Sequence, residues 1–106
     1  MSAGTPVTLR LATLALAAGA CAVAHANEAL ATKHGCQNCH EVSKKLVGPS
    51  FKSVAEKYKG QAAAPEMLGK KLLSGSTGVW GPIPMPAMPG IPAEDACALV
   101  AWVLVQ

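Results

Sequence analysis

The sequence is poor in aromatic residues, in charge and in basic clusters. Only four of its 106 residues are Phe, Tyr or Trp, and 14% are charged. The net charge is +3 and no basic run is longer than two residues, so nothing supports nucleic-acid binding. One short domain with so few large side chains seldom buries enough apolar surface alone. Such a domain usually needs a covalent staple or a bound group.

The N-terminal apolar run is too short to span a bilayer. It covers residues 11–24, about 14 residues, whereas a membrane helix needs roughly 20. Arg10 precedes the run, and the Ala-His-Ala sequence at 24–26 matches an A-x-A cleavage pattern. We therefore expect residues 1–26 to be a cleaved secretory signal peptide and residues 27–106 to form the mature domain. Export from a bacterial cytoplasm places that domain in the periplasm, without stable membrane insertion.

One short segment carries the clearest chemical pattern. Cys36 and Cys39 are separated by two residues and His40 follows at once, which is the C-x-x-C-H pattern of haem attachment. Each thiol can form a thioether bond with one haem vinyl group, and the imidazole can then bind the iron from the same side. The pattern predicts one covalently attached haem c, which would be the staple that the small core needs.

A bare C-x-x-C pair has two other interpretations. Half of a zinc site would need a second pair of ligands at a suitable spacing, and a thioredoxin-like dithiol would need a βαβ pattern. The sequence offers neither. The other cysteine and histidine residues, which form no ligand-spaced pair, are Cys21, His25, His34 and Cys97.

Cap residues, apolar spacing and glycine stops predict four short helices. We place them at 27–34, 50–59, 65–74 and 93–105, with Asn27 and Ser50 as N-caps, Pro65 in a first turn, and Gly35, Gly60 and Gly75 as stops. The residues expected to face inward include Phe51 in the second helix and Ala96, Leu99, Val100 and Val103 in the last. His34, near the end of the first helix, is expected to be exposed rather than to compete for iron. Cys97 shares an apolar strip with Ala101 and Val105. Partial burial is the simpler interpretation of Cys97, and a contact face or a disulfide-linked dimer is the alternative.

A proline-rich segment is the second informative region. Five of the eight prolines lie between Pro82 and Pro92, a density that neither a helix nor a central strand tolerates. We expect a stiff loop over residues 76–92, which holds a side chain in place at a lower entropic cost. Met85 offers a soft thioether ligand, and His/Met ligation raises the haem potential. Met85 is the expected second axial ligand, with Met88 as the alternative.

The segment 27–106 resembles a small class I cytochrome c of the short bacterial cytochrome c-551 type. Besides the haem motif, the matching segments are Val47-Gly48-Pro49, Gly78-Val79-Trp80-Gly81-Pro82-Ile83-Pro84-Met85-Pro86 and Ala101-Trp102-Val103-Leu104. The resemblance implies an all-α fold of four short helices around one haem with one exposed edge. One departure is the lack of an asparagine shortly after Met85, which in the family hydrogen-bonds toward the sulfur. This leaves the orientation of the Met85 methyl group open.

The resemblance also implies roles for single residues. The implied cofactor-binding residues are Cys36, Cys39, His40, Pro49, Lys71, Trp80 and Met85. Both cysteines would carry the haem, and His40 and Met85 would bind its iron. The Pro49 carbonyl would accept a hydrogen bond from the His40 ring. Trp80 would hydrogen-bond a haem propionate, and Lys71 would lie near one.

The implied function is single-electron transfer by a periplasmic carrier that is not an enzyme. Its donor and acceptor, periplasmic or membrane-bound redox proteins, would dock transiently at the haem edge, with Lys44 and Lys45 steering acidic partners. A monomer is favoured over a dimer. One alternative is a permanent subunit of a dehydrogenase or reductase. Another is a haem enzyme or sensor with an open iron site, which would need a distal acid or base that the proline-rich loop lacks.

Overall fold

The computed structural model describes residues 2–4 and 28–106. Most of the predicted signal peptide and the predicted helix cap at Asn27 therefore lie outside the described residues. The described part is helical, with α1 at Glu28–Lys33, the 3-10 helix η2 at Cys36–Asn38 and α2 at Phe51–Tyr58. These are followed by α3 at Ala64–Ser74 and α4 at Ala93–Leu104. An all-α fold with four α-helices is thus confirmed.

The helices begin and end where the local sequence favours it. Ser50 caps α2, because its Oγ accepts a hydrogen bond from the Ser53 backbone N–H at 3.0 Å. Pro65 lies in the first turn of α3, where a missing N–H is harmless. Gly75 follows the last residue of α3 at φ 80° and ψ 171°, a conformation open essentially to glycine alone.

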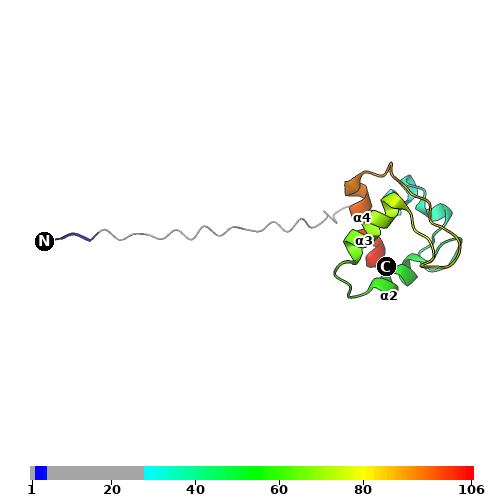
Figure 1. Ribbon diagram of the computed structural model, residues 1–106, viewed down its shortest axis with the longest axis horizontal. Coiled ribbons are helices and arrows are strands. Elements are labelled where there is room, and N and C mark those ends of the chain that lie inside the picture. Colours follow the sequence, from blue (N-terminus) through cyan, green and yellow to red (C-terminus); the bar gives the residue numbers. More distant parts are fainter. Residues whose placement is uncertain (1, 5–27) are drawn as a thin grey trace.

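The C-terminal helix α4 is the centre of the packing. It contacts α1, α2 and α3, and Figure 1 shows its red C-terminal end near α2. A small core cluster consists of Ala31, Ile91, Ala96 and Leu99. Three of the four residues predicted to face inward from α4 are buried, and Val103 is half-buried. Cys97 is also half-buried.

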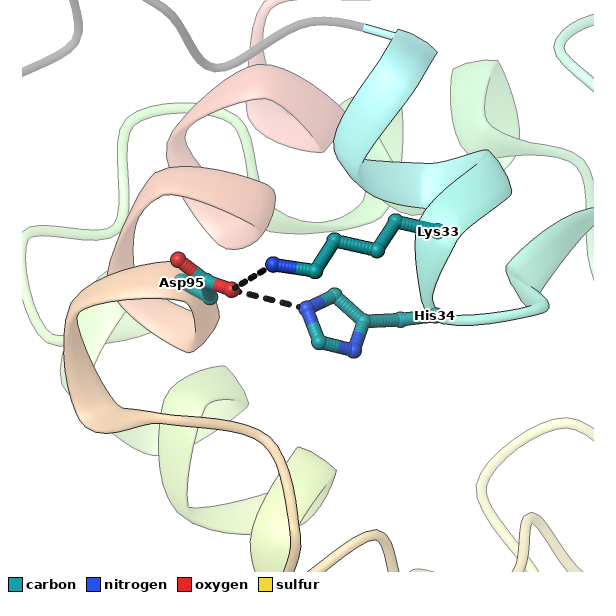
Figure 2. Close-up of polar contacts among 3 residues, drawn as sticks. All are labelled: Lys33, His34 and Asp95. Atoms are coloured by element: carbon teal, nitrogen blue, oxygen red, sulfur yellow. Dashed lines mark hydrogen bonds and ion pairs between the residues drawn. The ribbon is translucent and has the colours of Figure 1, made fainter.

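The expectation that His34 is exposed was wrong. Its side chain is 14% exposed, and its ring Nε2 lies 2.8 Å from Asp95 Oδ2 at the start of α4. Since an ionised carboxylate only accepts hydrogen bonds, the ring nitrogen donates. Figure 2 shows Lys33 approaching the same oxygen, with Nζ at 3.7 Å. Two consecutive residues at the end of α1 therefore tie this helix to α4.

The hydrogen bond from His34, followed by the charge of Lys33, lowers the pKa of the Asp95 carboxyl against the opposing effect of desolvation. This carboxylate is therefore more stable in the folded protein than in the unfolded chain. His34 is not among the residues that line the site described next.

Candidate haem site

The two cysteines of the C-x-x-C-H pattern are presented by a tight turn. Gly35 has φ 71° and leads from α1 into η2. The backbone N–H groups of Cys39 and His40 both donate to the Cys36 carbonyl, at 3.2 and 2.9 Å. Neither cysteine forms a disulfide, and both are half-buried. Burial raises the pKa of the Cys36 thiol against the opposing effect of a backbone hydrogen bond.

The His40 ring is held in one orientation by a backbone carbonyl. Its Nδ1 lies 2.7 Å from the Pro49 oxygen. Because a carbonyl can only accept a hydrogen bond, Nδ1 carries the proton. In the neutral ring, Nε2 then keeps its lone pair and is the atom that can bind a metal.

Two further residues pack against the faces of this ring. Phe51 stacks on it with ring centroids 5.3 Å apart and an angle of 23° between the planes. Gly48 lies close by, so that a Cβ at this position would come within 2.8 Å of the His40 Nδ1. Only a residue without a side chain fits at Gly48, and the ring has little room to turn.

Met85 is held by backbone pairing with the segment after α3. The Met85 N–H donates to the Ser76 carbonyl at 2.9 Å, and the Ser76 N–H donates to the Met85 carbonyl at 3.1 Å. Met85 is half-buried and lines the same cavity as His40. Met88 instead packs against the core cluster that contains Ile91 and Leu99, and it does not line the cavity. The geometry therefore favours Met85 over Met88 as the sulfur ligand.

The cavity contains all the groups that a covalent haem requires. Both thiols, the His40 imidazole and the Met85 thioether line it. Apolar side chains from α2, α3 and α4 form much of its wall: Val54, Leu68, Leu72, Leu99, Val100 and Val103. A large apolar macrocycle with two vinyl groups and a central iron needs apolar walls, two thiols, an imidazole lone pair and a soft donor. The residues present fit haem c.

The remaining predicted site residues also line this cavity. Pro49, Lys71 and Trp80 all belong to its wall. Trp80 is 38% exposed, and the Lys57 Nζ lies 5.3 Å from the centroid of its ring. This cation–π contact was not expected from the sequence, in which Lys57 is one of several lysines on the polar face of α2. All seven predicted cofactor-binding residues are thus brought together around one cavity.

Comparisons with known proteins agree with this chemistry. The family model described as Cytochrome c matches residues 24–105. The chain is 49% identical over 75 residues to cytochrome c-551 of Allochromatium vinosum, which covers 71% of this chain and 80% of the relative. It is 44% identical over 81 residues to cytochrome c-552 of Nitrosomonas europaea, covering 76% of this chain and 79% of the relative.

Solved structures show the same fold. The crystal structure of wild-type Nitrosomonas europaea cytochrome c552 matches with a TM-score of 0.72 and 44% identity, over 74% of this chain and 96% of that one. The class 1 cytochrome MtoD from Sideroxydans lithotrophicus matches with a TM-score of 0.63 and 32% identity, over 76% and 91% of the two chains.

The chain belongs to the cytochrome c family. Within that family, the identities of 44–49% to proteins named cytochrome c-551 and c-552 indicate a small class I cytochrome c. Haem c is accordingly its cofactor, and electron transfer is its function. Within residues 2–4 and 28–106, no helix is both long and apolar enough to cross a membrane.

Proposed function

We propose that this chain is a periplasmic carrier that shuttles single electrons between redox proteins, with His40 and Met85 as its two axial ligands. The observation that carries this proposal is the placement of both residues on one apolar cavity, each held by backbone hydrogen bonds. Bound haem supplies an iron that alternates between the ferrous and ferric states. The protein's task is to keep both ligands in place through that change.

The residues around His40 do this on one side of the cavity. The Pro49 carbonyl accepts the Nδ1 proton, which fixes the tautomer and increases the electron donation from Nε2. Phe51 and Gly48 restrict rotation of the ring. A ligand that is already oriented needs little rearrangement when the charge on the iron changes, and this favours fast electron transfer.

The composition of the wall argues against an enzyme with an open iron site. Besides the two cysteines and His40, the only titratable side chains that line the cavity among the described residues are Tyr58 and Lys71, and none is a carboxylate. General acid–base chemistry on a bound substrate needs a titratable group within hydrogen-bond reach of the reacting atom. Both expected axial positions are also supplied by the chain itself, so a substrate would have to displace a ligand.

Partners are proposed to dock where the cavity opens to solvent. Val47, Val79 and Ile83 line the cavity and are 53%, 38% and 62% exposed. Exposed Lys44 and Lys45 lie close by in sequence and can steer acidic partners at low ionic strength. Such encounters bury less than about 1,200 Å² and are transient. A permanent subunit contact through the apolar strip has less support. Of its residues, Cys97 and Ala101 are half-buried and only Val105 is exposed.

Absorption spectra of the purified protein test this proposal. The oxidised protein should show a low-spin spectrum with the weak sulfur-to-iron charge-transfer band, and carbon monoxide should not change the spectrum of the reduced protein. A high-spin spectrum with prompt carbon monoxide binding would favour the open-site enzyme or sensor. Fractionation of the bacterial cell tests the location, since the mature chain beginning at Asn27 should be found in the periplasmic fraction.

A further inference from the structure

The chain makes an unusually close contact between the end of α3 and the loop that carries Met85. Gly75 follows α3 directly, and its N–H still donates to the Lys71 carbonyl at 2.8 Å. A Cβ at Gly75 would lie 2.9 Å from the Met85 carbonyl oxygen and 2.9 Å from the Ala87 nitrogen. Both neighbours are backbone atoms, which cannot rotate away as the end of a side chain can.

Backbone hydrogen bonds enclose this contact on both sides. Ser76 exchanges two hydrogen bonds with Met85, and the Met88 N–H donates to the Leu72 carbonyl at 3.0 Å. Leu72 and Ser76, before and after Gly75, are thus bonded to Met88 and Met85, which lie after and before Ala87. The loop can lie this close to the helix end only because position 75 has no side chain.

The backbone conformation imposes the same requirement. At φ 80° and ψ 171°, Gly75 occupies a region that residues with a Cβ essentially do not enter. Gly60 also has a positive φ, of 74°, but a Cβ there would meet no atom within 4 Å. The two glycines therefore share a positive φ, and only Gly75 has a neighbour that a side chain would displace.

We propose that Gly75 is a positioning residue for the axial sulfur. Because position 75 has no side chain, the backbone of Met85 can pair with Ser76 just after α3, and this pairing keeps the sulfur on the iron. The inference rests on the proposed ligation of the iron by Met85. A side chain at Gly75 would push the loop outward, and the sulfur would move with it. The iron would then be open more often to an external ligand.

The test compares Gly75→Ala with Gly60→Ala in the haem-loaded protein. Cyanide affinity of the ferric form measures how easily the sulfur is displaced. We expect Gly75→Ala to bind cyanide at least tenfold more tightly than the wild type and to lose intensity in the charge-transfer band. Gly60→Ala should remain within about twofold of the wild type. Equal cyanide affinities in the two variants would overturn the proposal.

Amide hydrogen exchange in the reduced protein provides a readout that does not depend on the iron ligand. The Ser76 and Met85 amides should exchange at least tenfold faster in Gly75→Ala, whereas the Ala96 amide in α4, which donates to the carbonyl of the preceding Pro92, should be unchanged. Uniformly faster exchange across all amides would mean a general loss of stability and would refute a positioning role.

A second experiment needs no variant, and applies even if Gly75→Ala does not fold with haem. Saturating the ferric wild type with cyanide should accelerate exchange at Ser76 and Met85 and leave Ala96 protected. Releasing the sulfur should weaken the backbone hydrogen bonds between Ser76 and Met85. Unchanged protection at Ser76 and Met85 would overturn the proposal while leaving the ligation by Met85 intact. Prompt cyanide binding by a wild type without the charge-transfer band would instead overturn the ligation, and the inference with it.

Discussion

Truncation of Phe51 should be among the most damaging substitutions outside the haem ligands. Its side chain is 5% exposed and lies between two other rings, stacked on His40 and 5.1 Å from the Trp102 centroid in an edge-on arrangement. Phe51→Ala removes a fully packed ring and leaves a cavity, which lowers the free energy of unfolding by about 3–5 kcal/mol. A domain of this kind is stable by about 5–15 kcal/mol, so the loss is a large fraction of the total.

The variant Phe51→Leu separates apolar burial from ring contacts. Leucine fills much of the same volume, but it forms neither the stacked pair with His40 nor the edge-on pair with Trp102. Aromatic pairs contribute about 0.5–1.5 kcal/mol beyond burial, and a near volume-conserving exchange costs less than about 1.5 kcal/mol. We therefore expect Phe51→Leu to lose about 1–3 kcal/mol, less than Phe51→Ala.

Urea unfolding of the ferric, haem-loaded protein, followed by circular dichroism, measures these losses. Leu46→Ala is the matched control, because Leu46 is 44% exposed and does not line the haem cavity. Its effect should stay within about 0.5 kcal/mol. A loss below about 1 kcal/mol for Phe51→Ala would refute the claim that this ring supports the His40 side of the site.

Three other substitutions test separate contacts. Gly48→Ala should displace the His40 ring and lower the yield of haem-loaded protein with a low-spin spectrum, as measured by absorption. Asp95→Asn should lower the urea midpoint at pH 7, and this difference should shrink as the pH falls below the unfolded pKa of about 3.9 and disappear below the lowered folded pKa, where the carboxyl is protonated in both states. Lys57→Met should lose about 0.5–1 kcal/mol in unfolding experiments, and less in a Trp80→Leu background, where only the contact of Lys57 Nζ with the Tyr58 ring at 5.9 Å remains.

Each of these has a clear contrary outcome. A wild-type spectrum and yield for Gly48→Ala would show that the ring has more freedom than the close contact implies. A constant difference between Asp95→Asn and the wild type at all pH values would mean that the charge of the carboxylate is irrelevant. Additive losses for Lys57 and Trp80 would show that the two side chains are not coupled.

Local patterns were sufficient to predict the helices, and they also supply the residues proposed as haem ligands. The caps and stops at Ser50, Pro65 and Gly75 depend on backbone chemistry within a few residues, and the structure places them as expected. The C-x-x-C-H pattern is also local, because its spacing alone matches the haem vinyl groups. The proline-rich pattern alone does not separate Met85 from Met88, since both lie in the same loop.

Several long-range contacts could not be read from the sequence. His34 and Asp95 are 61 residues apart, and no local signal pairs them. The apolar spacing of α2 indicated that Phe51 faces inward, but not that it stacks on His40. Gly75 looked like an ordinary helix stop, and its second role emerges only when the Met85 loop is placed against it. Long-range packing decides each of these cases.

The central claim is that Met85, and not Met88, completes the coordination of the iron opposite His40. The most direct measurement is the absorption spectrum of Met85→Ala and Met88→Ala, each oxidised and then reduced under carbon monoxide. We predict that Met85→Ala loses the sulfur-to-iron charge-transfer band and binds carbon monoxide promptly, whereas Met88→Ala keeps the band and does not bind carbon monoxide. Retention of the band in Met85→Ala, or its loss in Met88→Ala alone, would contradict the account.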